Sequence, residues 1–120
     1  MEKIVIIEDD KNLLNFLENS LAKYGFMVFG LDSGKDAFKK IEEINPEFII
    51  LDIMLPYIGG LEILNWVKTN YPHIKVILAT AKDKIEDIKT GFSLNADYYL
   101  TKPYTISEIL KAIELLKAIS

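Results

Sequence analysis

The chain has 120 residues, 50% hydrophobic and 27% charged, so it is long enough for one domain with a single core and too hydrophobic for a disordered chain. Its 14 basic residues are all lysines, and 18 acidic residues bring the net charge to −4, which argues against nucleic-acid binding by this domain. The sequence has no cysteine, no run of about 20 apolar residues and no signal-peptide core. We therefore expect a cytoplasmic protein without disulfides, thiolate chemistry or membrane contact.

Short apolar runs alternate along the chain with longer segments of helical periodicity. In chain order we expect a strand at 4–7, a helix at 11–24, a strand at 26–31, a helix at 33–44, a strand at 48–51, a helix at 61–69, a strand at 75–79, a helix near 83–94, a strand at 98–100 and a helix at 106–119. Asp10 precedes the first helix and suits either a helix N-cap or an acidic site, and we favour the cap. The second helix opens with Ser33-Gly34-Lys35-Asp36, which has the spacing of a capping box.

Alternation of strands and helices indicates βαβ units, and these units form a parallel sheet with helices on both faces. The predicted strands are apolar throughout, as expected where both faces of the sheet are covered. The fold class is therefore α/β, a doubly wound sheet of five strands flanked by five helices. The pattern alone leaves the strand order open, apart from right-handed crossovers.

Polar side chains follow the ends of several predicted strands. They are Glu8, Asp9 and Asp10, then Asp52, then Thr80, and finally Thr101 and Lys102. Because the carboxyl ends of parallel strands share one edge of the sheet, we expect these side chains at one rim, where such sheets bind ligands. Converging carboxylates raise one another's pKa unless a cation lies between them, and oxygen ligands without His or Cys suit a hard divalent cation.

Four segments of the sequence carry a resemblance to a known family. They are Ile6-Ile7-Glu8-Asp9-Asp10, Leu51-Asp52-Ile53-Met54-Leu55-Pro56 with Gly60, Ala79-Thr80-Ala81, and Ala96-Asp97-Tyr98-Tyr99-Leu100-Thr101-Lys102-Pro103. In this order and spacing the chain resembles the receiver domains of bacterial two-component response regulators, including the chemotaxis regulator, over residues 1–120. The resemblance implies a flavodoxin-like strand order of 2-1-3-4-5.

The resemblance also implies a phosphoacceptor and a metal site. Asp52 would accept a phosphoryl group from a sensor histidine kinase and hold it as an acyl phosphate. Asp9, Asp52 and the backbone carbonyl of Met54 would bind Mg²⁺ directly, and Glu8 would bind it through water. The Mg²⁺ ion would neutralise charge on the transferring group.

Further residues would contact the phosphoryl oxygens: Lys102 through its charge, Thr80 through its hydroxyl and Ala81 through its backbone N–H. Thr80 and Tyr99 would form the switch. The resemblance also predicts a cis peptide bond between Lys102 and Pro103. The implied function is a phosphorylation-dependent signalling switch, which catalyses only its own phosphorylation and dephosphorylation.

The implied output surface comprises the last two strand–helix units, around residues 84–94, 98–100 and 106–118. When Thr80 turns toward a phosphoryl group it vacates space that Tyr99 can fill, and the packing of this face changes. The partners would be the kinase and a downstream protein or an attached output domain. A homodimer through the same face fits as well.

Three other functions are compatible with parts of this pattern. A Mg²⁺-dependent phosphohydrolase with an aspartyl nucleophile commonly needs a second acid two positions later, where this chain has Met54. A nucleotide or flavin binder would carry a glycine-rich phosphate loop, and neither common form is present. A degenerate receiver that only binds proteins is disfavoured because the acids, Thr80 and Lys102 are all present.

Several residues have simpler interpretations. Glu8 and Asp9, taken alone, suit solvated charges at a helix start, and only their combination with the other motifs indicates a site. We expect core packing for Tyr98 and for the face of Trp66, and a surface position for His73.

Three positions depart from the usual family pattern. Gly59 stands where an acid often precedes the glycine after the phosphoacceptor loop, which would loosen that loop. Asn95 replaces a frequent glycine, and asparagine tolerates the positive φ of a turn. Tyr104 stands where phenylalanine is common, and none of the three removes a group of the predicted site.

Overall fold

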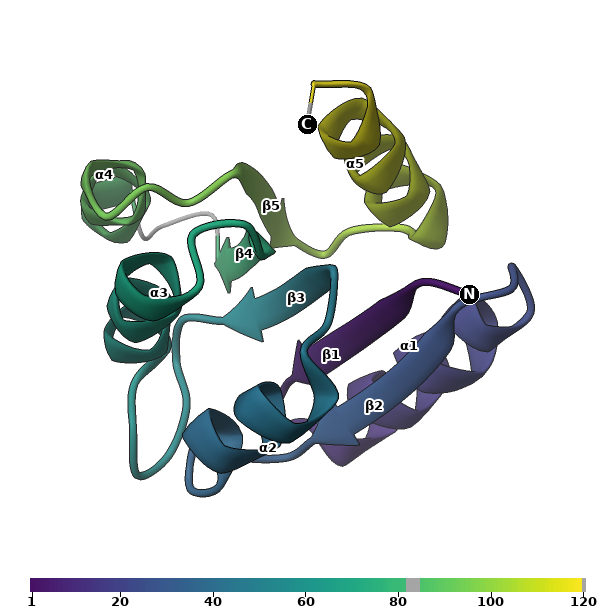
Figure 1. Cartoon of the computed structure of the whole chain (residues 1–120), viewed down its shortest axis with the longest axis horizontal. Helices are drawn as coiled ribbons and strands as arrows, with labels where there is room; N and C mark the ends of the chain where they lie inside the picture. Colours follow the sequence, from purple (N-terminus) through teal and green to yellow (C-terminus); the bar gives the residue numbers. More distant parts are fainter. Residues whose placement is uncertain (82–84, 120) are drawn as a thin grey trace.

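A computed structural model describes residues 1–81 and 85–119 of the chain (Figure 1). The elements in order are β1 (Lys3–Ile7), α1 (Lys11–Ala22), β2 (Met27–Leu31), α2 (Ala37–Ile44), β3 (Phe48–Asp52), α3 (Gly60–Asn70), β4 (Lys75–Ala81), α4 (Ile85–Ser93), β5 (Tyr98–Lys102) and α5 (Ile106–Ile119). Within the described residues, no helix is both long enough and apolar enough to span a membrane.

The five strands form one parallel sheet in the order β2-β1-β3-β4-β5. Helices α1 and α5 cover one face of this sheet, and α2, α3 and α4 cover the other (Figure 1). The α/β class, the burial of both faces and the flavodoxin-like order are therefore confirmed. The order also places β1 and β3 side by side at the centre, with their carboxyl ends at one rim.

Alternate residues of each strand supply the two cores. In β1, Ile4 and Ile6 pack with α1 and α5, whereas Val5 and Ile7 pack with α2 and α3. All four side chains are fully buried, and β-branched residues suit a pleated surface that is covered on both sides. This packing explains why the strands are continuous apolar runs.

The observed α2 begins later than the capping-box pattern predicted. Ser33 Oγ accepts a hydrogen bond from Lys35 N at 3.2 Å and closes a local turn, and the helix starts only at Ala37. Gly34 makes this turn fit, because a Cβ there would lie 2.5 Å from the Ile58 carbonyl oxygen. The prediction of a helix from residue 33 was therefore wrong by one turn.

Other boundaries shift by a few residues. Strands β4 and β5 extend two residues beyond the predicted ends, because Thr80 pairs with Thr101 and Ala81 with Lys102. Of the predicted helix near 83–94, residues 83 and 84 lie outside the described residues, and α4 spans Ile85–Ser93. Asn95 has φ +70°, as the sequence predicted for this turn.

Candidate phosphoacceptor site

Three carboxylates converge at the carboxyl ends of β1 and β3. Glu8, Asp9 and Asp52 each offer one oxygen, and these oxygens lie within 4.8 Å of one another. Glu8 and Asp52 are 2% and 5% exposed, whereas Asp9 faces solvent. The rim therefore holds a compact acidic cluster that is open on the side of Asp9.

Lys102 joins this cluster from the far side of β4. Its Nζ donates to Glu8 Oε1 at 2.8 Å and to Asp52 Oδ2 at 3.1 Å. The peptide bond from Lys102 to Pro103 is cis, as predicted, and the chain turns away from the rim there into α5. One ammonium thus bridges two buried carboxylates at the ends of the adjacent strands β1 and β3.

The second oxygen of Asp52 is also engaged. Asp52 Oδ1 accepts a hydrogen bond from Met54 N at 3.1 Å, and the Met54 side chain is exposed. The loop then returns so closely that a Cβ at Gly60 would collide with the Asp52 carbonyl oxygen, and Gly60 N donates to Ile53 O at 2.9 Å. The sequence motif included Gly60, but this close approach depends on tertiary distances that spacing cannot show.

Burial and charge shift the pKa values of the groups around the cluster. Burial raises the pKa of Glu8, the charge of Asp52 adds to this, and the Lys102 hydrogen bond opposes it. Burial alone would lower the pKa of Lys102, but the hydrogen bond to Glu8 and the charge of Asp52 outweigh it and raise that pKa. Burial and the charge of Glu8 raise the pKa of Tyr104 to about 12. The cluster therefore favours cations and keeps Lys102 protonated.

Thr80 lies in β4, the strand between Asp52 and Lys102. Its side chain is 1% exposed, and its Oγ1 has no hydrogen-bond partner within the described part of the chain. Ala81 follows at the exposed end of β4 and pairs with Lys102. A buried hydroxyl without a partner is costly, so its presence beside the cluster calls for an explanation.

The other predicted residues take the following positions. Asp10 caps α1, because its Oδ1 accepts from Asn12 N at 3.0 Å and Leu13 N at 3.2 Å, and this preference is confirmed. Tyr98 packs partly buried against the α1–α5 core, and Tyr99 lies on the opposite face against α4, away from the carboxylates. His73 is exposed, as expected.

Trp66 is only partly buried. It lies between the rings of Phe38 and Tyr71, with centroids at 4.6 and 5.6 Å. Trp66 thus packs against the α2–α3 core, as predicted, but at its margin rather than inside it.

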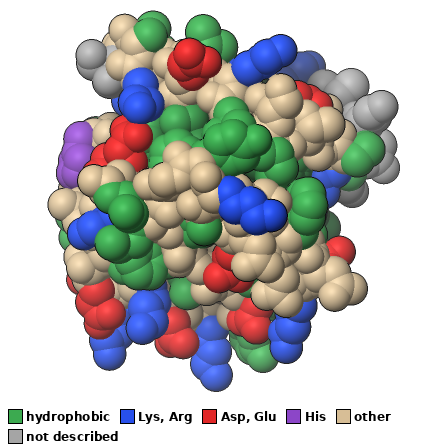
Figure 2. Space-filling view, turned by 90° about the vertical axis from the view of Figure 1, so that its right-hand side faces the viewer, with side chains coloured by type: hydrophobic (Ala, Val, Ile, Leu, Met, Phe, Trp, Pro, Cys, Tyr) green, Lys and Arg blue, Asp and Glu red, His purple; other side chains and the backbone are tan. Residues whose placement is uncertain are grey.

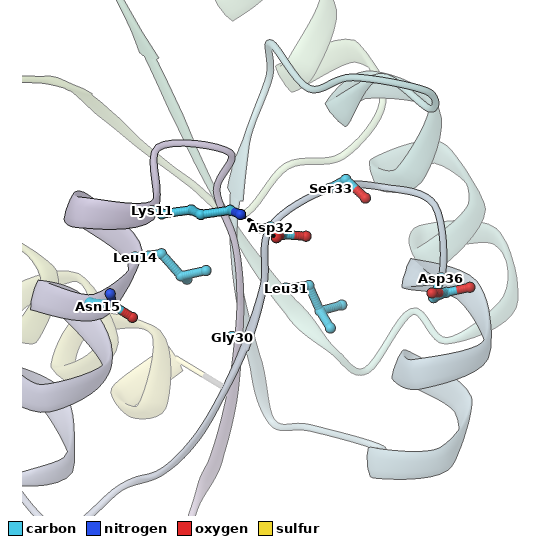
Figure 3. Close-up of a pocket in the computed structure, with 8 residues that line it drawn as sticks. All are labelled: Lys11, Leu14, Asn15, Gly30, Leu31, Asp32, Ser33 and Asp36. Carbon is cyan, nitrogen blue, oxygen red and sulfur yellow. Dashed lines mark ion pairs between the residues drawn. The ribbon is translucent and has the colours of Figure 1, made fainter.

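A separate cleft of about 390 Å³ lies beside β2, between α1 and α2 (Figure 3). It is lined by Lys11, Leu14, Asn15, Gly30, Leu31, Asp32, Ser33 and Asp36. Its one ion pair between lining residues joins Lys11 Nζ to exposed Asp32 Oδ2 at 3.8 Å. None of the predicted site residues lines it, so this cleft is distinct from the acidic cluster.

Charges of both signs are interspersed on the face seen in Figure 2, and no basic patch is visible there. This distribution agrees with the net charge of −4. An electrostatic footprint for nucleic acid would require lysines gathered on one surface.

Comparison with known proteins adds independent findings. The family model of the response regulator receiver domain matches residues 4–114. The receiver domain of the Francisella response regulator 1452 is 28% identical with a TM-score of 0.89, and the match covers 100% of both chains. A DNA-binding response regulator of the LuxR family from Staphylococcus aureus is 31% identical with a TM-score of 0.89, over 96% of this chain and 98% of that one. Response regulator DrrB of Thermotoga maritima, an OmpR/PhoB homologue, is 32% identical with a TM-score of 0.88, and this chain spans 54% of its length.

The 2-1-3-4-5 sheet with carboxylates and a lysine at its carboxyl edge defines the class of flavodoxin-like receiver modules. With residues 4–114 matched, the chain belongs to the response regulator receiver domain family of two-component signalling systems.

Proposed function

We propose that residues 1–120 form one cytoplasmic receiver domain in which Asp52 accepts a phosphoryl group from a sensor histidine kinase. The observation that carries this proposal is the Asp52 carboxylate, which is 5% exposed, lies beside Glu8 and Asp9, and is held by Lys102 at 3.1 Å. A carboxylate held in one orientation among charge-stabilising groups is a suitable nucleophile for phosphoryl transfer.

In the proposed reaction, an oxygen of Asp52 attacks the phosphorus of a phosphohistidine. The P–N bond breaks with its electron pair going to the imidazole, and a P–O bond forms, which gives an acyl phosphate. Lys102 then holds a phosphoryl oxygen through its charge, and the Ala81 N–H donates to another. The domain catalyses only its own phosphorylation and dephosphorylation.

The donor set fits a magnesium ion. Asp9 and Asp52 would bind it directly together with the Met54 backbone carbonyl, and Glu8 would bind through water. All these ligands are oxygens, and the acidic oxygens already lie within 4.8 Å of one another. Among the described residues, three carboxylates face one ammonium, so this part of the cluster has an excess of negative charge that a divalent cation would balance. When bound, Mg²⁺ would neutralise charge on the transferring group.

Thr80 and Tyr99 are the proposed switch residues. The buried Thr80 Oγ1, which has no partner among the described residues, would donate to a phosphoryl oxygen on Asp52 and thereby gain a hydrogen bond. Such a gain in one state only is what biases a two-state equilibrium.

The proposed output surface is formed by α4, β5 and α5. Phe92 and Leu115 on these helices are 56% and 54% exposed, and Ile119 is 75% exposed. The partner would be a downstream protein or an attached output domain, and a second copy of this chain fits the same apolar face. We propose no contact of this domain with nucleic acid or membranes.

The test is labelling with acetyl phosphate in the presence and absence of Mg²⁺, read by intact mass. We expect one added phosphoryl group on the wild type with Mg²⁺ and none on Asp52→Asn. Asp32→Asn is the matched control, since Asp32 is an exposed acid outside the cluster, and it should label as the wild type does. Undiminished labelling of Asp52→Asn would contradict the assignment of the phosphoacceptor.

A further inference from the structure

Strand β2 lies at one edge of the sheet, and within the described residues β1 is the one strand that pairs with it (Figure 1). In a parallel pair, alternate residues of a strand bond to the partner through their backbone groups. Met27 N donates to Glu2 O at 2.9 Å on the β1 side, which fixes this alternation. Val28 and Gly30 therefore direct their backbone N–H and C=O groups away from the sheet. Such outward groups can pair with a strand of another chain.

A groove follows this edge between α1 and α2. It consists of the cleft of about 390 Å³ in Figure 3 and a second hollow of about 490 Å³, and Gly30 and Leu31 line both. Val28, Phe29 and Ile44 line the second hollow and are only partly buried, so apolar surface lies beside the outward backbone groups. We call the two hollows together the β2 edge groove.

The Glu18 side chain of α1 reaches over β2 at Gly30. A Cβ built on Gly30 would lie 2.6 Å from Glu18 Cδ and 2.6 Å from Glu18 Oε1, so the missing side chain makes room for this carboxylate. Glu18 is half-buried, and within residues 1–81 and 85–119 its carboxylate has no hydrogen bond or ion pair. Glycine weakens a strand interior and often marks the close approach of a ligand or another backbone. An unpaired acceptor thus lies over the part of β2 whose backbone faces outward.

The charges of the groove leave an excess of negative charge. Four carboxylates and two lysines line it. Lys11 and Lys40 each lie 3.8 Å from an acidic partner, whereas Glu18 and Asp36 have no basic partner in the described part of the chain. The groove therefore complements a segment that carries positive charge.

A second copy of this chain is a poor occupant. Antiparallel pairing of β2 with β2 of another copy would bring the two Glu18 carboxylates to the same face of the joined sheet. Like charges across a strand pair are destabilising, and both lysines of the groove already have acidic partners. The charges favour a different protein.

We propose that the β2 edge groove binds an extended segment of another protein that carries lysine or arginine among apolar residues and adds a strand beside β2. Val28 and Gly30 provide the main-chain hydrogen bonds. A basic side chain of the segment lies over Gly30 and binds Glu18 on the α1 side, whereas its alternate side chains contact Phe29 and Leu31 on the α2 side. The groove contains no residue of the acidic cluster, so this surface goes beyond the proposed function and does not depend on it.

The probe is the capped peptide Ser-Val-Lys-Val-Lys-Val-Ser, titrated into ¹⁵N-labelled protein and followed by NMR. We expect shifts of the Val28 and Gly30 amides and slower hydrogen exchange of both. The matched peptide Ser-Val-Glu-Val-Glu-Val-Ser should bind about fivefold more weakly, because it replaces attraction to Glu18 by repulsion.

Two variants separate the backbone contribution from the charge. Val28→Pro removes an outward N–H and leaves the β1 ladder intact, since proline is tolerated on an edge strand where its nitrogen faces solvent, and it should abolish binding. Glu18→Gln should weaken the lysine peptide about threefold. Glu62→Gln, an exposed acid of α3 outside the groove, is the matched control and should bind as the wild type does.

Equal binding of the two peptides, or undiminished binding by Glu18→Gln, would overturn the assignment of a basic partner. The docking surface itself would be overturned if neither peptide shifts the Val28 and Gly30 amides, or if the shifts gather at the acidic cluster instead. Shifts of these amides that grow with protein concentration in the absence of peptide would assign the edge to a second copy of the chain and contradict the proposal.

Discussion

Replacing Lys102 by methionine tests the electrostatics of the cluster directly. The substitution keeps most of the side-chain stem and removes the ammonium that bridges Glu8 and Asp52, which are 2% and 5% exposed. Breaking a buried ion pair on one side costs about 3–5 kcal/mol. Because the Lys102 side chain is 30% exposed, we take the lower end and expect a loss of about 3 kcal/mol in the free energy of unfolding at pH 7 without metal.

Magnesium should restore much of this loss. A ligand that binds only the folded state stabilises it by about 2.7 kcal/mol at 100 times its Kd. In the wild type the ion must share the Glu8 and Asp52 carboxylates with the Lys102 ammonium, whereas in Lys102→Met it faces them alone. We therefore expect a larger Mg²⁺-dependent gain in the variant than in the wild type.

The measurement is urea unfolding with Mg²⁺ and with EDTA. Lys40→Met is the matched control, because the Lys40–Glu43 pair is 3.8 Å apart and exposed, and such pairs contribute about 0.5 kcal/mol or less. The reasoning is refuted if Lys102→Met without metal is as stable as the wild type. It is equally refuted if Asp9→Asn leaves the Mg²⁺ effect unchanged.

The same deficit should depend on pH. Burial raises the folded-state pKa of Glu8 above its ordinary value of 4.5, and removing the Lys102 ammonium raises it further. A carboxyl group with a raised folded pKa destabilises the fold when ionised. That penalty is relieved as the pH falls through the raised value and is gone below 4.5. The deficit of metal-free Lys102→Met should therefore shrink on acidification from pH 7.

Two further substitutions test the scaffold around the site. Lys68→Met should lower the free energy of unfolding in urea by about 3 kcal/mol. Lys68 Nζ is bound to Asp97 Oδ2 at 2.9 Å and to two backbone carbonyls, and only 9% of the side chain is exposed. A loss below about 1 kcal/mol would contradict the interpretation as a buried ion pair. Tyr57 has φ +69° in the loop after Asp52, a conformation that asparagine tolerates. Tyr57→Asn should therefore raise the free energy of unfolding by about 0.5 kcal/mol, since the contact to Lys35 that it removes is exposed. A thermal melt with no rise would show that the loop carries no strain at residue 57.

The class of the fold could be predicted from the sequence because its signals are local. The inner strands, such as β1 and β3, are short apolar runs buried on both faces, and helices such as α1 and α5 have an apolar stripe. The order of the strands depended on the resemblance, since hydrophobic patterns do not specify neighbours. Strands β4 and β5 ran longer than predicted because the pairs Thr80–Thr101 and Ala81–Lys102 continue the ladder. The local sequence pattern does not indicate how far two distant segments pair.

The membership of the site could also be predicted, because parallel strands bring their carboxyl ends to one rim. Glu8, Asp9, Asp52 and Lys102 meet there as expected. The bridging of two acids by one ammonium was not predicted, and neither was the closeness of Gly60 to the Asp52 backbone. Both depend on distances of a few ångströms between segments, which residue types and spacing do not determine. The roles of these residues in phosphoryl transfer stay predictions.

The bonding pattern of the rim suggests where the free energy of switching would come from. Lys102 binds two carboxylates at once, while the Thr80 hydroxyl in the neighbouring strand is buried and has no partner among residues 1–81 and 85–119. A buried polar group left without a hydrogen bond costs about 1–3 kcal/mol. On the proposed function, a phosphoryl group on Asp52 brings acceptor oxygens within reach of Thr80, and the cost is recovered only in the modified state. Because a ligand shifts an equilibrium only by its differential interaction with the two states, this unsatisfied hydroxyl is itself a source of the bias toward the phosphorylated arrangement.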